Sequence, residues 1–140
     1  SRAADFRQDS QSRSAGGVLR GLHGRGGRGE AKLVRCARGA VQDVLVDTRT
    51  ESPTFGQWFD VVLDDVECAH LFVPPGFLHG FLTLGETADV CYRIDRPHEP
   101  SEDVGVRWDD ADLAIRWRGT PSIVSDRDAA AGSWRDLAEG

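Results

Sequence analysis

Residues 17–47 read GVLRGLHGRGGRGEAKLVRCARGAVQDVLVD, and the rest of the chain is organised around them. It begins with the apolar pair Val18-Leu19 and passes through a glycine-rich loop at residues 24–29. Two runs of alternating apolar and polar residues follow, 31–37 and 40–47, with Arg38-Gly39 between them. A short glycine-containing link between two such runs is typical of a tight β-hairpin. The stretch therefore predicts short antiparallel strands.

The rest of the chain continues this pattern of short strands separated by turn signals. Strands are predicted at residues 57–63, 70–73, 79–84 and 88–95, weaker ones at 104–108 and 113–117, and an edge strand near residues 6–8. Residues 79–84 and 88–95 are expected to pair around Gly85-Glu86. Only residues 126–138 have a helical pattern, with Ser125 as the expected N-cap. This pattern predicts an all-β sandwich or barrel.

Length and composition limit the classes of protein that fit. A chain of 140 residues with 39% hydrophobic residues is enough for one domain with a single core. The net charge of -6 argues against nucleic acid or an anionic membrane as the main partner. The three cysteines, Cys36, Cys68 and Cys91, lack paired spacing, so we expect reduced, mostly buried thiols of a cytoplasmic protein. The sequence contains no cluster of cysteine and histidine residues, so it does not predict a zinc site.

Several predicted strands carry one ionisable residue toward a common interior. Alternation places Tyr92 with aliphatic neighbours, Asp43 in line with the inward positions of its strand, and His79 on the side of Phe81. Lys32 is the only lysine in an arginine-rich chain, which favours a role that arginine cannot fill. Each of these could instead be a core residue with satisfied polar atoms, and Lys32 a solvated strand end.

The motifs of this chain resemble those of the dTDP-4-dehydrorhamnose 3,5-epimerase family, in the family's order. They are GVLRGLH at residues 17–23, AKLVRCARGAVQDVLVD at 31–47, SPTFGQW at 52–58, VPPGFLHGFLTL at 73–84, VCYRID at 90–95 and SDRDAA at 125–130. The resemblance implies a double-stranded β-helix, the jelly-roll cupin barrel, with a short C-terminal helical segment. Residues 1–140 would form a single cupin domain, and we expect the N-terminal strands usual in the family to be missing.

The resemblance also implies roles for individual residues. His23 would be the general base, Asp128 the carboxylate that orients it, Lys32 the cation at the enolate oxygen, and Tyr92 the acid on the opposite face. The positions implied for substrate binding are Gln8, Ser10, Arg20, Arg25, Asp43, His79 and His98. Arginines 20, 25 and 28 would provide charge for a diphosphate, a task that suits guanidinium geometry. No cofactor or metal is implied.

These roles are chemically consistent with an epimerase. Removing a proton beside a ketone requires a base and a donor at the developing oxyanion, and inversion requires a second proton carrier on the other face. The resemblance implies an epimerase of a dTDP-linked 4-keto-6-deoxyhexose at C3, C5 or both, in deoxysugar biosynthesis. The family resemblance further implies that the protein is a cytoplasmic homodimer with no nucleic-acid or membrane partner. A ketoisomerase of a similar sugar, or a non-catalytic cupin that binds a sugar nucleotide or a protein, are the alternatives.

Overall fold

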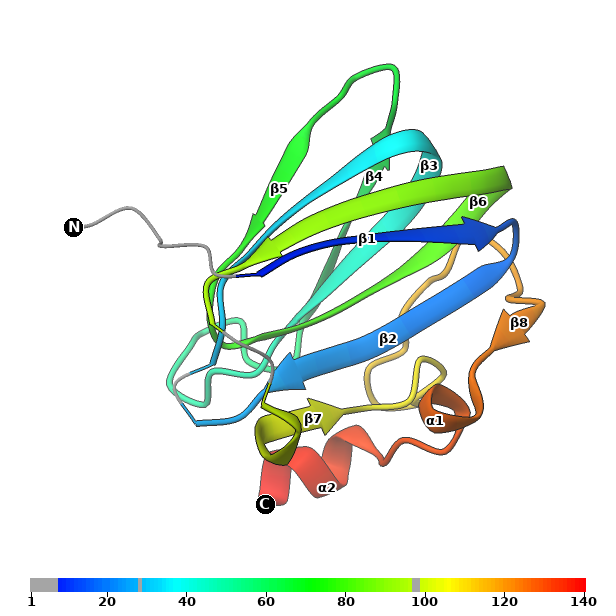
Figure 1. Ribbon diagram of the computed structural model, residues 1–140. Helices are drawn as coiled ribbons and strands as arrows, with labels where there is room; N and C mark the ends of the chain where they lie inside the picture. Colours follow the sequence, from blue (N-terminus) through cyan, green and yellow to red (C-terminus); the bar gives the residue numbers. More distant parts are fainter. Residues whose placement is uncertain (1–7, 28, 97–98) are drawn as a thin grey trace.

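The computed structural model of the protein describes residues 8–27, 29–96 and 99–140, and most of these lie in β-strands (Figure 1). The elements in chain order are β1 (Gln8–Ala15), β2 (Val18–Arg25), β3 (Lys32–Asp47), β4 (Trp58–Asp64), β5 (His70–Val73), β6 (Phe77–Ile94), the 3₁₀-helix η1 (Pro100–Glu102), β7 (Asp103–Gly105), β8 (Ile123–Val124), α1 (Asp126–Ala129) and α2 (Trp134–Glu139). The predicted all-β jelly-roll barrel with a short C-terminal helical segment is confirmed.

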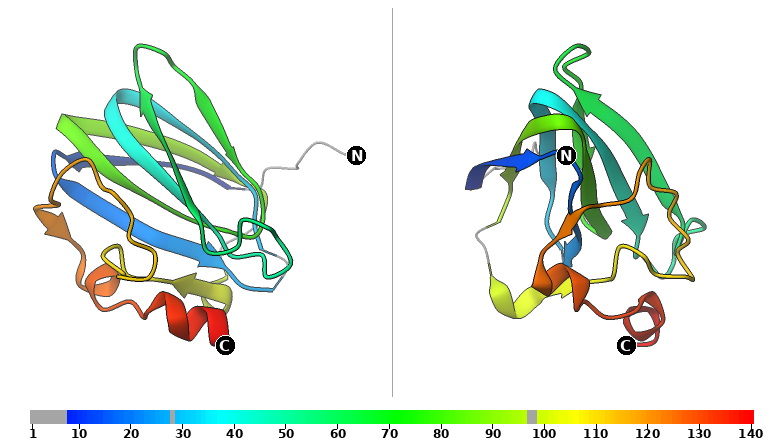
Figure 2. Two further views of the ribbon diagram at one scale, coloured as in Figure 1. Left: turned by 180° about the vertical axis from the view of Figure 1, so that it is seen from behind. Right: turned by 90° about the vertical axis from the view of Figure 1, so that its right-hand side faces the viewer.

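Two long strands, β3 and β6, organise the barrel because each bends and takes part in both halves of its single eight-stranded sheet. In one half the first part of β3 and the last part of β6 pair with each other, flanked by β5 and β1. In the other half the last part of β3 and the first part of β6 pair, flanked by β4 and β2. Figures 1 and 2 show the strands wrapping around a common interior, with α1 and α2 beside β2 and β7.

Both predicted hairpins are wrong, because each supposed turn is a bend within one continuous strand. Strand β3 continues through Arg38-Gly39 with shifted register, and β6 continues through Gly85-Glu86. Gly39 has a φ of 81°, and a Cβ there would lie 2.0 Å from the carbonyl oxygen of Thr87 on β6. Glycine is needed at this point because the two bent strands cross at contact distance.

The C-terminal third also departs from the sequence pattern. Residues 113–117 form no strand, and the strand predicted at 104–108 is reduced to β7 and a single bridge between Val106 and Gly132. The predicted helix at 126–138 is two short helices, interrupted near Gly132-Ser133. Ser125 caps α1 as predicted, since its Oγ accepts a hydrogen bond from the Asp128 amide at 3.1 Å.

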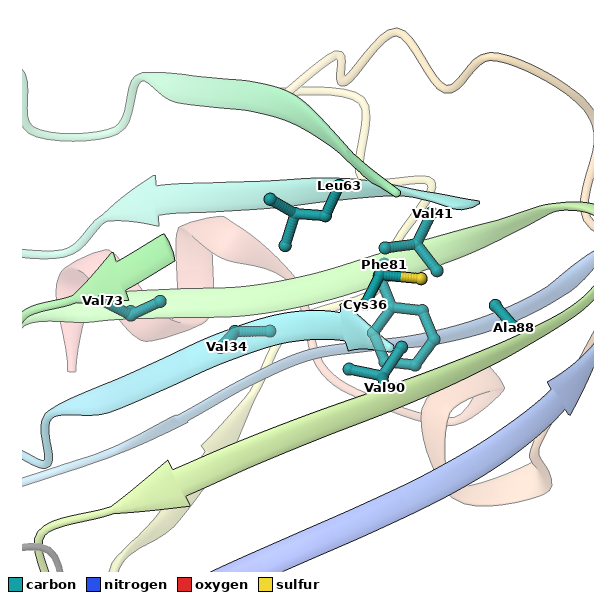
Figure 3. Close-up of a cluster of buried hydrophobic side chains, with 8 residues drawn as sticks. All are labelled: Val34, Cys36, Val41, Leu63, Val73, Phe81, Ala88 and Val90. Atoms are coloured by element: carbon teal, nitrogen blue, oxygen red, sulfur yellow. The ribbon is translucent and has the colours of Figure 1, made fainter. Parts of the chain in front are cut away.

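Two clusters of buried side chains stabilise the barrel. The first lies inside it and contains Val34, Cys36, Val41, Leu63, Val73, Phe81, Ala88 and Val90 (Figure 3). The second packs the C-terminal segment against the outer face of β2, β3 and β6, and contains Leu22, Val44, Val46, Leu78, Val106, Leu113 and Trp134. The segment that follows β7 is thus anchored to the barrel.

The expectation of mostly buried thiols holds for only one of the three cysteines. Cys36 is buried in the first cluster, Cys91 is half-buried, and Cys68 is exposed. All three are free thiols. The turn after β4 explains the exception, because Cys68 lies there with a φ of 55°, outside any packed strand. Among the described residues, no helix has the length and apolar character needed to cross a membrane.

Candidate active site

A cavity of about 410 Å³ opens between β2, β6 and α1, and most of the predicted site residues face it. The predicted residues in its wall are Arg20, His23, Arg25, Lys32, His79, Tyr92 and Asp128. They come from four elements, β2, β3, β6 and α1, that span most of the sequence. The fold therefore brings together site residues that lie in separate motifs along the chain.

His23 and Asp128 form a close polar contact in this wall. The Nε2 atom of His23 lies 2.5 Å from Oδ1 of Asp128, and the other carboxylate oxygen accepts a hydrogen bond from the Gly21 amide at 3.1 Å. Asp128 is buried, whereas the His23 side chain is 39% exposed toward the cavity. A buried carboxylate that fixes one ring nitrogen leaves the other nitrogen for a second partner.

The backbone around Gly21 presents His23 to the cavity. The pairing of β2 with β6 shifts register between Arg20 and His23. Gly21 lies directly against Gly80, where a Cβ on Gly21 would be 2.6 Å from the Gly80 Cα. The close approach of two glycines allows β2 to bulge without losing contact with β6. The bulge places the Gly21 amide and the His23 ring on the same carboxylate.

Lys32 begins β3 and is half-buried in the same wall. Burial lowers the pKa of its ammonium group, Glu30 and Asp43 oppose that shift, and Arg25 adds to it. A cation in this setting has lost part of its water shell. It is therefore available to a negatively charged or carbonyl oxygen that enters the cavity.

Asp43 and His79 form a second histidine–carboxylate pair deeper in the barrel. Nε2 of His79 lies 2.8 Å from Oδ1 of Asp43, and both side chains are buried. Sequence alternation predicted that Asp43 would face inward and need a partner, and the structure provides one. Of the two, only His79 lines the cavity, so Asp43 lies behind it.

Tyr92 lies on β6 opposite Ser10 of β1 and Val34 of β3. Its neighbours Val90 and Ile94 are buried, and Tyr92 itself is half-buried in the cavity wall. The predicted inward face of this strand is confirmed. Asp89 on the same strand is also buried, and Arg13 of β1 contacts its carboxylate at 2.7 Å.

The predicted diphosphate arginines have different environments. Arg20 is exposed at the cavity and donates from Nε to Ser14 Oγ at 3.0 Å. Arg25 was expected in a flexible loop, but β2 extends to it and its side chain is buried. The register of β2 explains this difference, because Arg25 pairs with Asp103 of β7 and is held in the sheet. Arg28 lies outside the described residues.

Three other residues are predicted to bind the substrate: Gln8, Ser10 and His98. Ser10 lines a separate cavity of about 260 Å³ that Tyr92 also borders. The backbone of Gln8 pairs with Ile94, and only its backbone is described. His98 lies outside the described residues. The part of the chain that the structure describes contains no cluster of three or more histidine, cysteine or acidic residues that could hold a metal ion.

Comparisons with known proteins identify the family to which this arrangement belongs. The model of the dTDP-4-dehydrorhamnose 3,5-epimerase family matches residues 1–136. The chain belongs to this family. The dTDP-4-dehydrorhamnose 3,5-epimerase of Salmonella typhimurium is 46% identical over 132 residues, which cover 93% of this chain and 72% of that protein.

Solved structures of the family support the same assignment. A dTDP-6-deoxy-D-glucose-3,5-epimerase of Legionella pneumophila, in complex with dTDP-4-keto-L-rhamnose, is 42% identical with a TM-score of 0.87, covering 91% of this chain and 69% of that one. A 3'-monoepimerase of Streptomyces bikiniensis, in complex with dTDP-quinovose, is 35% identical with a TM-score of 0.86, covering 95% and 67%. The family is one of epimerases, which are enzymes of the isomerase class.

Within this epimerase fold, the cavity also contains charged residues that the sequence analysis did not single out. They are Glu30, Asp103 and Arg127. Arg127 directly precedes Asp128, and Glu30 lies two positions before Lys32, so proximity to a predicted site residue was an available signal. Asp103 gave no such signal, because only the pairing of β7 with β2 brings it beside Arg25.

Proposed function

We propose that the protein epimerises a dTDP-linked 4-keto-6-deoxyhexose at C3, C5 or both, as a step of deoxysugar biosynthesis. The observation that carries this proposal is the His23–Asp128 pair, whose imidazole faces the same cavity as Lys32 and Tyr92. The family relatives that bind dTDP-sugars favour the same substrate class. We further expect a cytoplasmic homodimer, as the family resemblance implies.

The chemistry follows from the three groups. His23, with Nε2 held by Asp128, takes the proton from the carbon beside the ketone through Nδ1. The electron pair of that C–H bond moves onto the ketone oxygen, where the Lys32 ammonium stabilises the charge. Tyr92 then returns a proton from the opposite face, which inverts the carbon. The exposed guanidinium groups of Arg20 and Arg127 would hold the diphosphate at the cavity rim.

Deuterium wash-in tests this function directly. We would incubate the protein with dTDP-4-keto-6-deoxyglucose in heavy water and locate the label by NMR. Label at C3 and C5 supports a 3,5-epimerase, and label at C3 alone supports a 3-epimerase. An absence of label with every 4-keto sugar nucleotide would favour a binding protein, and a His23→Asn variant measures the non-enzymatic background.

A further inference from the structure

Arg20 is an exposed arginine of the cavity wall whose guanidinium is anchored to a neutral hydroxyl. Its Nε donates a hydrogen bond to Oγ of Ser14 at 3.0 Å, and Ser14 is only 3% exposed. Arg20 lines the cavity that contains His23 and Lys32, and so does Ser12, two positions before Ser14 on the same side of β1. The bond therefore joins a buried oxygen to a cation that a ligand in the cavity can reach.

This hydrogen bond crosses a gap between two strands. β1 pairs with the last part of β6, where Ser14 lies opposite Ala88, and β2 pairs with its first part, where Arg20 lies opposite Phe81. In the part of the chain that the structure describes, no pairing joins β1 directly to β2. Figure 1 shows the two strands diverging from the turn that connects them. The Arg20 side chain thus reaches from one strand to the other at the cavity.

The turn between β1 and β2 keeps the serine in place. The Gly16 amide donates to the Glu86 carbonyl oxygen at 2.7 Å, and the Gly17 amide donates to that of Thr83 at 3.1 Å. Both acceptors belong to β6, the strand with which β1 and β2 pair. Ser14 therefore presents its oxygen to the guanidinium from a fixed part of the backbone.

The partner of Arg20 differs from those of the other arginines in the cavity wall. Arg25 lies 3.4 Å from a carboxylate oxygen of Glu30, and Arg127 lies 3.4 Å from one of Asp103. Arg20 forms no ion pair with any described carboxylate. A hydroxyl is neutral, so it orients the guanidinium without cancelling its charge. Arg20 thus combines a fixed orientation with a charge that is free to attract an anion.

The anchored Nε also decides which edge of the guanidinium can meet a ligand. A guanidinium is a planar group with five N–H donors, and it contacts two oxygens either through Nε and one terminal nitrogen or through both terminal nitrogens. Ser14 occupies the Nε–H, whereas neither Nη1 nor Nη2 of Arg20 forms a hydrogen bond with any described residue. The terminal edge therefore remains for two oxygens of a phosphate.

We propose that Ser14 is a positioning residue that holds Arg20 with its two terminal nitrogens toward the diphosphate of the substrate. This role rests on the proposed function, which places Arg20 at the diphosphate. Ser14 is not part of the cavity wall itself, so it acts through Arg20. The benefit lies in binding, because a long side chain that is already ordered loses less conformational entropy when the ligand arrives.

A double-mutant cycle tests this role with Ser14→Ala, Arg20→Met and the combined variant. We measure the Kd of dTDP by calorimetry, the saturating deuterium exchange rate and the melting temperature. Ser14→Ala should raise the Kd about three- to tenfold, the cost of ordering one long side chain on binding. With Arg20→Met already present, it should change the Kd less than about twofold, because the residue through which it acts is gone.

The other readouts separate positioning from a structural role. Ser14→Ala should leave the saturating exchange rate and the melting temperature close to those of the parent. The matched control is Ser101→Ala, at an exposed position on η1, which should leave the Kd of dTDP unchanged.

Three results would overturn the role of Ser14. Equal weakening of dTDP binding with and without Arg20 would mean that Ser14 acts independently of it. A lower melting temperature with an unchanged Kd would make Ser14 a structural residue, and a lower saturating exchange rate with an unchanged Kd would place its effect in the chemistry. Binding of dTDP requires no turnover, so a parent that shows the expected coupling but exchanges no deuterium rejects the epimerase and supports the positioning role.

Discussion

The barrel contains two histidine–carboxylate pairs whose histidines are neighbours in the sheet but have different environments. His23 on β2 and His79 on β6 are partners in the sheet register. The His23 side chain is 39% exposed, and that of His79 is 8% exposed. Asp128 binds both the ring and the Gly21 amide, whereas neither oxygen of Asp43 forms a well-aligned hydrogen bond with a described residue.

The difference shows how the surroundings of two chemically similar pairs can give them different roles. Asp128 is held from two sides, so it can fix the orientation of His23 while the ring still faces the cavity. Asp43 lies behind His79 and contacts it only through a 2.8 Å approach. A base must reach its substrate, which the first pair allows. The second pair fits a fixed inner wall better.

The largest expected effect comes from replacing one histidine at a time with asparagine. His23→Asn should slow deuterium exchange by about 10⁴-fold, because general base catalysis contributes up to that much. His79→Asn should cost less than about tenfold in exchange but lower the free energy of unfolding by about 3 kcal/mol, since it leaves a buried carboxylate unpaired. NMR exchange rates and urea denaturation measure the two effects. Equal loss of exchange in both variants would contradict the division of labour.

The carboxylates give the next contrast. Asp128→Asn should slow exchange by about 10²–10³-fold, because it weakens both the orientation and the charge stabilisation of His23 without removing the base. Asp43→Asn should slow it far less, since Asp43 has no contact with that ring. Steady-state exchange at saturating substrate is the measurement. A larger loss for Asp43→Asn would place His79, and not His23, at the proton.

Tyr92 sharpens the comparison, because inversion requires a group that neither pair provides. Tyr92→Phe should still wash deuterium into the substrate through His23 but form inverted product at least about tenfold more slowly at one centre. The measured quantity is the ratio of exchange to inversion, followed by NMR. If the ratio matches that of the parent, another group or water delivers the second proton.

The smallest expected effect is a shift in the pH dependence of the exchange rate when the charge of Glu30 is removed. Glu30 raises the pKa of Lys32 against the lowering by burial, so Glu30→Gln should lower that pKa further. The protonated cation is then lost at lower pH, and the alkaline limb of the exchange rate should move to lower pH. Glu51→Gln, at an exposed loop position, is the matched control and should leave the limb in place.

The sequence predicts the strands and the inward ionisable residues well, because alternation records which side of a strand is buried. It fails at Gly39 and Gly85, because a left-handed glycine suits both a hairpin turn and a bend within one strand. Only the contact of Gly39 with Thr87 on another strand decides between them. Local patterns contain no information about that partner.

The sequence predicts the candidate active site about as well as it predicts the strands. The motifs identify His23, Lys32, Tyr92 and Asp128, and the structure places all four around one cavity. The motifs misplace Arg25, because a run of glycines around an arginine is typical of a mobile loop. Pairing with Asp103 of β7, distant in sequence, instead keeps Arg25 in the sheet and buries it.

The central place of β3 and β6 in the sheet has a consequence for how the protein unfolds. The flanking strands β1, β2, β4 and β5 all pair with β3 or β6, so loss of the pairing between these two strands would release both halves of the barrel together. Fraying can begin at β5, β8 or the C-terminal helices, which have few sheet partners. The amides at the centre of β3 and β6 are therefore expected to exchange with solvent only through global unfolding. Cooperative unfolding of this barrel thus depends mainly on the pairing of β3 with β6.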